Sequence, residues 1–222
     1  MNPHVQIVWG SLLALAVACA ALPASAADPA EAVRQHALAD LKDPAVEKRR
    51  QAVMYLAVVA QQKDAAVLLD ELRDPDIPTA KLAEAALWQL WGRSGNKTVD
   101  AIVSQGIAAM NQGMLETSVE LFTEAIKRQP AFAEAWNKRA TAYYLMGEYK
   151  KSLKDCDQVM KRNPYHFGAL AGYGQIYLRL AEPRRALIYF DRALAINPNM
   201  EEIADMTERI RTKLGESDDR TI

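Results

Sequence analysis

The chain has 222 residues, of which 50% are hydrophobic and 25% charged, and its 27 lysines and arginines nearly cancel 28 aspartates and glutamates. This balance excludes an extended basic surface or an acidic tail, so no nucleic-acid partner is expected. The two cysteines, Cys19 and Cys156, and the three histidines show no metal-ligand spacing, and no nucleophile is paired with a general base in any motif. The sequence therefore predicts no catalytic residue, no metal site and no cofactor.

The first 27 residues contain no Lys, Arg, Asp or Glu. An apolar run over residues 12–22 is followed, after a proline, by the small residues 24–27. A hydrophobic core followed by an A-x-A motif is typical of a secretory signal peptide, here cleaved after Ala26 or Ala27. We therefore expect export, with the bacterial periplasm as the destination.

Two alternatives to cleavage stay open for this segment. Only the amino terminus and His4 can carry positive charge in it, whereas signal peptides usually begin with Lys or Arg, so an uncleaved anchor is one alternative. The apolar run is short for a membrane span, which needs about 20 residues. The other alternative is a lipoprotein acylated at Cys19, although the usual leucine three residues ahead is missing. A membrane contact is expected only in these two cases.

Residues 28–97 contain a faint internal repeat. The segment Leu38–Pro44 recurs 31 residues later as Leu69–Pro75, and each copy ends in Asp-Pro. An aspartate can cap the following helix while the proline occupies its first turn. The arrangement resembles a HEAT-type repeat, and the resemblance implies HEAT-like helix pairs over residues 28–97.

Four large apolar residues close this region: Leu87, Trp88, Leu90 and Trp91. We interpret them as the core of a junction with the repeats that follow the turn-rich link 92–97. Because Trp91 and Ile102 lie close together in the chain, the sequence predicts one continuous solenoid and not two free domains.

Three prolines with a period of 34 residues, Pro130, Pro164 and Pro198, define the units 99–132, 133–166 and 167–200. A fixed period of 34 is typical of repeats made of two antiparallel helices. After the third unit, residues 201–214 are predicted to form a capping helix with a polar outer face. The polar stretch 215–222 is predicted to be a flexible tail.

Small and large side chains alternate at fixed positions within these units. A small residue at position 8 lets the two helices of a unit approach, and a large residue at position 24 fills the space beside that contact. The expected structural positions are Gly106, Phe122, Pro130, Trp136, Ala140, Tyr143, Pro164, Gly174, Tyr177, Phe190 and Pro198. Gly113 and Gly147 suit the turn between the helices, where the third unit has Ala181.

These motifs resemble the tetratricopeptide repeat (TPR), with its pattern W-x2-L-G-x2-Y, then A-x3-F, then P. The resemblance covers roughly residues 99–200. Together with the upstream repeat it implies an all-α, right-handed α-solenoid of helix–turn–helix repeats. The expected domains are a signal peptide at 1–27, HEAT-like helices at 28–97, and three TPR units with a capping helix at 98–214.

The resemblance also implies a concave groove lined by the first helix of each unit. The partner-binding residues carried over from the family are Met110, Glu134, Asn137, Thr141, Tyr144, Ala171, Gln175 and Leu178. Met110, Tyr144 and Leu178 would form an apolar ladder, and the neighbouring amides would bind a peptide backbone. The lysine of the family's clamp for a terminal carboxylate is missing. The chain's own upstream helices or its capping helix could instead fill the groove.

The favoured interpretation is an exported, non-enzymatic adaptor or scaffold that captures a protein or peptide in the groove. The alternative is a carrier of a small molecule or lipid, or a catalytic accessory, in the bacterial envelope. It would use a pocket beside the small residues Gly168 and Gly172. Copurification of a small ligand would favour the carrier, whereas polypeptide capture that depends on Tyr144 and Asn137 would favour the scaffold.

Overall fold

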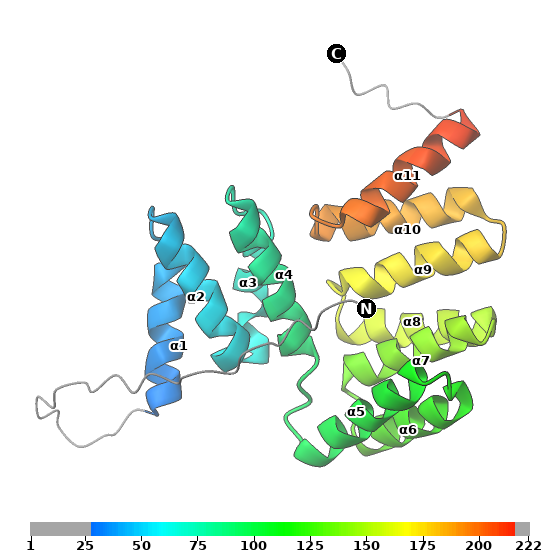
Figure 1. The fold of residues 1–222 in the computed structure, drawn as a ribbon, viewed down its shortest axis with the longest axis horizontal. Coiled ribbons are helices and arrows are strands. Elements are labelled where there is room, and N and C mark those ends of the chain that lie inside the picture. Colours follow the sequence, from blue (N-terminus) through cyan, green and yellow to red (C-terminus); the bar gives the residue numbers. More distant parts are fainter. Residues whose placement is uncertain (1–27, 216–222) are drawn as a thin grey trace, which may run out of the picture.

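The computed structural model describes residues 28–215 (Figure 1). All secondary structure in this described part is helical, and it includes one short 3-10 helix, η1 (Gln62–Asp64). The α-helices are α1 (Pro29–Asp40), α2 (Val46–Val59), α3 (Ala65–Glu71), α4 (Ile77–Trp91), α5 (Lys97–Asn111), α6 (Leu115–Arg128), α7 (Ala133–Leu145), α8 (Tyr149–Arg162), α9 (Phe167–Arg179), α10 (Pro183–Ile196) and α11 (Glu201–Leu214). The predicted signal peptide, Cys19 and the tail beyond residue 215 lie outside the described residues. Between residues 28 and 215, no helix is long and apolar enough to cross a membrane.

Helices α1–α4, called the N-terminal helices below, are entered through two similar turns. Asp43 Oδ1 accepts a hydrogen bond from the N–H of Ala45 at 2.9 Å, and Asp74 Oδ1 accepts one from Asp76 at 2.7 Å. Such side-chain turns direct the chain into the next helix. The prolines of the two Asp-Pro pairs precede helices α2 and α4, so the expectation that they occupy the first helical turn is wrong.

Buried arginine–aspartate pairs tie successive N-terminal helices together. Arg34 on α1 donates from Nε to Asp64 Oδ2 at 2.6 Å, and both side chains are only 4% exposed. Arg49 on α2 makes the same two-point contact with Asp74, with Nε at 2.6 Å from Oδ2. The planar fork of a guanidinium fixes the direction of such a contact, so these pairs set how neighbouring helices are oriented.

Helices α5–α10 form three antiparallel pairs that stack in chain order, and α11 covers the last pair (Figure 1). The predicted capping helix at 201–214 coincides with α11, which buries Ile203 and Ile210. The prolines with the 34-residue period lie in the turns after α6, α8 and α10.

Two glycines allow the helices of the first and third units to touch. A Cβ added to Gly106 would lie 2.5 Å from the Phe122 ring, and one added to Gly174 would lie 2.2 Å from the Phe190 ring. Real Cβ atoms do not approach other heavy atoms so closely, so a side chain at either position would displace the phenylalanine. The pairing of positions 8 and 24 therefore determines the spacing of the two helices in each of these units.

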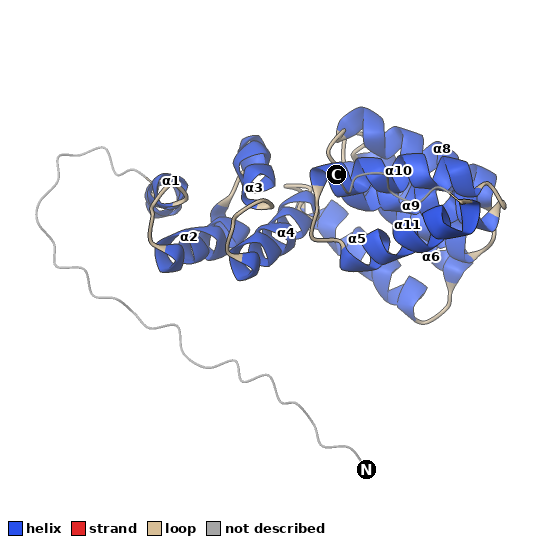
Figure 2. Cartoon of the chain, turned by 90° about the horizontal axis from the view of Figure 1, so that it is seen from above, coloured by secondary structure: helices blue, strands red, loops and turns tan. Residues whose placement is uncertain are grey.

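The N-terminal helices lie beside the stack of TPR helices and are not its continuation (Figures 1 and 2). Trp91 stacks on His166 with ring centroids 4.8 Å apart, and Trp88 meets Phe167 edge-on at 5.1 Å. His166 caps α9 and Phe167 is its first residue, so both lie far along the chain from α5. The prediction of one continuous solenoid is therefore wrong. The link from α4 to α5 turns the chain at Gly95, whose φ is 78°.

The junction core predicted from the sequence is present, although its partner is not the first repeat. Leu87, Leu90 and Trp91 are buried in one apolar cluster with Phe167, and Trp88 packs against it. These aromatic and leucine side chains therefore hold the two regions together through the second and third TPR units.

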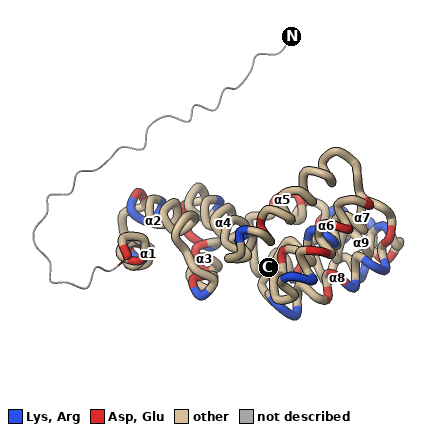
Figure 3. The backbone as a smooth tube through the Cα atoms, turned by 90° about the horizontal axis from the view of Figure 1, so that it is seen from below, with Lys and Arg blue, Asp and Glu red and all other residues tan. Residues whose placement is uncertain are grey.

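Polar contacts join the same two regions at the end of α10 and in the turn that follows it. The guanidinium of Arg73 donates to the backbone carbonyls of Ala195 and Ile196. Asn199 Nδ2 donates to the carbonyl of Leu72 at 2.7 Å. Along both regions, stretches with Lys or Arg are interspersed with stretches that have Asp or Glu (Figure 3).

Candidate functional site

The first helices of the three TPR units, α5, α7 and α9, lie next to one another, and α7 contacts both of its neighbours. The eight residues expected to line the concave face are distributed over these helices. Met110 lies on α5, Glu134, Asn137, Thr141 and Tyr144 lie on α7, and Ala171, Gln175 and Leu178 lie on α9.

Four of these eight residues surround one small cavity. Asn137, Thr141 and Tyr144 from α7 and Gln175 from α9 line a space of about 60 Å³. The remaining wall is formed by small or apolar residues of α7, α8 and α9: Ala140, Ser152, Cys156, Gly168, Gly172 and Ile176. The structure thus brings the expected polar groups of the middle of the groove together, and we call this space the concave-face cavity.

The cavity exists because the middle unit departs from its neighbours. Where the first and third units have glycine and phenylalanine, this unit has Ala140 and Cys156, and the thiol is much smaller than a phenyl ring. Gly172 on the opposite wall has no side chain, and a Cβ there would still be 3.9 Å from Cys156 Sγ. The loss of the ring and the absent side chain together leave space open to the groove.

The polar groups around the cavity are partly satisfied. Asn137 Nδ2 donates to Glu134 Oε2 at 3.1 Å, and Arg179 Nε donates to the hydroxyl oxygen of Tyr144 at 3.1 Å. Gln175 makes no side-chain hydrogen bond to any described residue. The free oxygen of Asn137 and the amide of Gln175 are therefore available to a ligand, since each side of a carboxamide can bond separately.

Two of the expected contact residues are buried and offer a partner almost no surface. Glu134 is 4% exposed and Ala171 is 6% exposed, so their assignment to the binding face is wrong. Ala171 belongs to the apolar cluster of the second and third units. Glu134 instead bonds His166, 3.0 Å away, and Lys138, also at 3.0 Å.

The Glu134–His166 contact is part of the junction with the N-terminal helices. His166 Nδ1 accepts the N–H of Ala169 as the cap of α9, so its proton lies on Nε2 and is donated to Glu134. Burial would raise the pKa of Glu134, but the hydrogen bonds from His166 and Lys138 hold it below its usual value. Since Trp91 covers the imidazole, Glu134 serves the packing of the fold.

The upstream helices close one end of the concave face. A Cβ on Gly168 would lie 2.2 Å from the indole of Trp88, so this ring occupies the space a side chain would fill. The possibility that the chain's own helices enter the groove is realised at this end only. Sequence reasoning missed Trp88 as a groove residue, and no signal near Gly168 would have indicated it.

The expected apolar ladder is not continuous. Met110 packs with the core of the first unit, and Tyr144 lies at the concave-face cavity. Leu178 lines a separate cavity of about 430 Å³ with Pro183 and residues of α11. Met110 is therefore separated from the other two, and Tyr144 and Leu178 pack against one apolar cluster but line different cavities. Arg179 beside Tyr144 was not anticipated, although its position one residue after Leu178 placed it near the groove.

The fold and this site define a class of protein, the α-solenoid that presents a concave face to a partner. Family models described as tetratricopeptide repeat match residues 133–166 and 167–200. A TPR repeat-containing protein of Rhizobium etli is 31% identical over 142 residues, which cover 64% of this chain and 69% of the relative. The chain belongs to the tetratricopeptide repeat family, and this membership supports a protein-interaction scaffold.

Other relatives are larger than this chain. Hsp70-Hsp90 organizing protein 1 of Glycine max is 28% identical over 144 residues, and the chain spans only 25% of it. Among solved structures, the first TPR of Spaghetti (RPAP3) bound to the HSP90 peptide SRMEEVD gives a TM-score of 0.51 at 20% identity, covering 53% of this chain and 93% of that one. MamA gives 0.50 at 16% identity, covering 61% and 79%. These likenesses show the fold.

Proposed function

We propose that this protein is an exported, non-enzymatic TPR scaffold that captures a segment of another polypeptide on its concave face. The observation that carries the proposal is the convergence of Asn137, Thr141, Tyr144 and Gln175 on one cavity. An aromatic ring beside free amide groups suits an extended segment, because the amides bond its backbone while the cavity accepts a small side chain.

The basic groups near the cavity argue against capture of a terminal carboxylate. Lys138 is paired with Glu134, and Arg139 is held by Asp155 at 2.7 Å. Arg179 is the cation that reaches the cavity, through the hydroxyl of Tyr144. A single cation already bonded to tyrosine does not form a two-sided clamp, so we propose an internal segment and not a chain terminus as ligand.

The carrier alternative fits this site poorly. The pocket expected beside Gly168 and Gly172 is present, but its volume of about 60 Å³ is far below the roughly 300–1,000 Å³ of small-molecule sites. The thiol of Cys156 in its wall is not a nucleophile, because burial raises its pKa to about 12. A segment that inserts one side chain matches the size of this cavity better than a lipid does.

Two further parts of the proposal concern the rest of the chain. We assign HEAT-like character to residues 28–97, supported by the matching Asp43 and Asp74 turns and by the arginine contacts between successive helices. Export to the bacterial periplasm rests on the pattern of residues 1–27. Mass spectrometry of the protein from its native host tests export, since a mature chain beginning after Ala26 or Ala27 is expected.

The scaffold function is tested with a crosslinked pull-down from envelope fractions. Wild type is compared with Tyr144→Ala/Asn137→Ala, and with Glu124→Ala/Arg128→Ala as a control, because that exposed ion pair lies on α6. A partner captured by wild type and by the control, and lost with the first pair, supports the concave face. Equal capture by all three proteins would overturn it.

A second variant separates binding from stability. Ala140→Gly/Cys156→Phe gives the middle unit the glycine–phenylalanine pair that packs in the other two units. We expect this protein to keep its melting temperature within a few degrees while the phenyl ring fills the cavity. Loss of capture with unchanged melting is the expected result, and full capture would show that the cavity is not used.

A further inference from the structure

A second depression runs along the junction between the N-terminal helices and the turns of the TPR units, and we call it the junction groove. It consists of two cavities of about 420 and 470 Å³, and Gln62, Ala65 and Tyr165 line both. The first cavity reaches the turn after α6, and the second reaches the end of α10. The groove therefore passes the turns of all three units. It shares no lining residue with the concave-face cavity.

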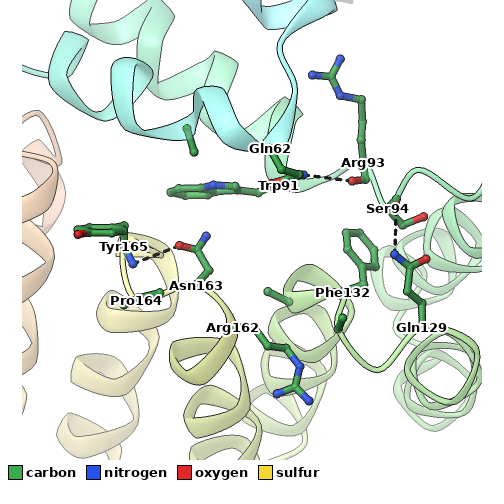
Figure 4. Close-up of a pocket in the computed structure, with 13 residues that line it drawn as sticks. Gln62, Trp91, Arg93, Ser94, Gln129, Phe132, Arg162, Asn163, Pro164 and Tyr165 are labelled. Atoms are coloured by element: carbon green, nitrogen blue, oxygen red, sulfur yellow. Dashed lines mark hydrogen bonds between the residues drawn. The ribbon is translucent and has the colours of Figure 1, made fainter.

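Aromatic surface and amide groups line the first cavity (Figure 4). Trp91 is 5% exposed, whereas Tyr165 presents 57% of its surface at the edge where the two cavities meet. A ring as exposed as Tyr165 gains by being covered, since burial of apolar area is favourable. The walls therefore offer an apolar contact surface in the centre of the groove.

Three carboxamides in the first cavity are each held at one end only. Gln62 Nε2 donates to the carbonyl of Leu90 at 2.9 Å, and Gln129 Nε2 donates to that of Ser94 at 2.8 Å. Asn163 Oδ1 accepts the N–H of Tyr165 at 3.1 Å (Figure 4).

These contacts fix the orientation of each amide and leave its other end without a partner among the described residues. The oxygens of Gln62 and Gln129 and the NH2 group of Asn163 remain. A peptide backbone needs this mixture, since it offers both N–H and C=O groups. Because the amides are already oriented, a peptide would lose little freedom from the protein side on binding.

The groove is also flanked by positive charge. Arg93 and Arg162 at the first cavity and Arg73 at the second donate to backbone carbonyls, and none of the three makes an ion pair with a carboxylate among residues 28–215. Lys63 lines the second cavity, where Asp70 is the single acidic side chain of the lining. Partial negative charge at helix C-termini offsets part of this excess. The remaining positive field attracts anions over about 10 Å at moderate salt.

We propose that the junction groove binds an extended, acidic segment of a second polypeptide, at a site separate from the concave face. The amides would hold the segment's backbone, the exposed ring of Tyr165 would contact its apolar side chains, and the flanking arginines would attract its carboxylates. A protein with both sites would hold two segments, or two parts of one partner, at once.

The test uses a phage-displayed library of random decapeptides selected on the full chain. Enriched peptides are synthesised, and their affinities are measured by fluorescence polarisation. Ala66 and Ala131 are exposed and lie at the two cavities, so substitutions there should leave the fold intact. The variant Ala66→Glu/Ala131→Glu adds two carboxylates, and Ala66→Lys/Ala131→Lys adds side chains of similar length with the opposite charge.

We expect acidic peptides to be enriched, to bind the glutamate pair at least about tenfold more weakly, and to bind the lysine pair as well as wild type or better. Tyr144→Ala/Asn137→Ala should leave the affinity of these peptides unchanged, although the same variant is expected to lose binding at the concave face. The proposal for the junction groove and the proposal for the concave face can therefore be tested separately. Absence of acidic enrichment overturns the proposal, as does equal binding by both pairs. Weaker peptide binding by both the glutamate and the lysine variants would place the binding site in the junction groove, but it would overturn the proposal that the bound segment is acidic.

Two other possible occupants of the junction groove, a segment of the chain itself and a second copy of the chain, are tested by two measurements on the same proteins. A rise in peptide affinity after removal of residues 1–27 or 216–222 would show that the chain's own segment fills the groove. A dimer in light scattering that dissociates with the glutamate pair would show that a second copy does. Either result would overturn the proposal, and unchanged affinity with a monomeric protein supports it.

Discussion

The N-terminal helices and the TPR helices are both helical stacks, but they are held together differently. Between the N-terminal helices, buried pairs such as Arg34–Asp64 supply directional contacts. In the first and third TPR units, a phenylalanine ring packs against a glycine of the facing helix, so the spacing of the two helices depends on side-chain volume at these positions. The N-terminal helices should therefore respond to charge and pH, and the first and third TPR units to changes in side-chain size.

The largest expected effect is the loss of a buried ion pair in the N-terminal helices. Asp64→Asn removes the charge that Arg34 contacts at two points and weakens the turn at Gln61, whose N–H bonds the same carboxylate. Arg34 would keep only the partly exposed Glu31 as a carboxylate partner, so the free energy of unfolding should fall by about 3 kcal/mol. Chemical denaturation measures the change, and hydrogen exchange localises it.

Hydrogen exchange also tests whether the two regions are separate cooperative units. Protection should fall in α1–α4 and stay unchanged in α5–α11, because the contacts that join the two regions lie at the ends of α9, α10 and α11 and in the adjoining turns. The control is Lys48→Ala, which removes an exposed pair with Asp43 and should have little effect. An equal loss of protection in α5–α11 would mean that the molecule unfolds as one unit.

Two glycines on α9 test the size dependence of the TPR helices. Gly174→Ala places a methyl group 2.2 Å from the Phe190 ring, and the forced shift should cost roughly 1–3 kcal/mol. Gly172→Ala on the same helix meets its nearest neighbour at 3.9 Å and should be neutral or stabilising. Thermal unfolding of the two variants gives the comparison, and equal melting temperatures would contradict it.

The sequence predicted the all-helical solenoid because its signals are local. The 34-residue spacing of prolines and the alternation of small and large residues depend on neighbours within one unit. Contacts between distant segments could not be read in this way. Trp88 against Gly168 joins residues 80 positions apart, and it depends on the direction in which the link at Gly95 sends the chain.

The candidate site shows the same limit. Asn137, Thr141, Tyr144 and Gln175 converge because the repeat places equivalent positions on neighbouring helices. Glu134 was expected on the same face of α7 but is buried, because it bonds His166, which Trp91 covers. The residue change that opens the cavity is present in the sequence, which has Cys156 at a position where the other units have phenylalanine. The alternation pattern alone did not indicate that this change opens a space.

The N-terminal helices should also show a distinctive pH dependence, centred on Glu71. Burial, and then the nearby charge of Asp74, raise the pKa of Glu71 to about 7, from 4.5. A carboxyl group with a raised pKa in the folded state favours folding below pH 4.5, and this contribution is lost as the pH rises through 7. Native Glu71 therefore destabilises the protein at neutral pH.

Replacing Glu71 should remove this dependence. Because the side chain is only half-buried, we expect Glu71→Gln to raise the free energy of unfolding by about 1 kcal/mol at pH 8 and to have little effect at pH 4.5. Asp70→Asn, an exposed neighbour, serves as the control and should show no such trend. A gain from Glu71→Gln that is the same at both pH values would contradict the role of its charge.

The smallest effect concerns the turns inside the TPR units. Gly113 and Gly147 have φ of 76° between their helices, whereas Ala181 adopts φ of 58° at the equivalent position of the third unit. A left-handed backbone conformation costs an L-residue about 1 kcal/mol, and glycine avoids this cost. Glycine also loses more conformational entropy on folding, which offsets part of the gain. Ala181→Gly should therefore stabilise the protein by about 0.5 kcal/mol, and Gly147→Ala should destabilise it by a similar amount or slightly more. Opposite shifts in the denaturation midpoint are the expected result.

Shifts of the same sign would show that the three turns are not equivalent, and the TPR units would then differ in their turns as well as in their packing.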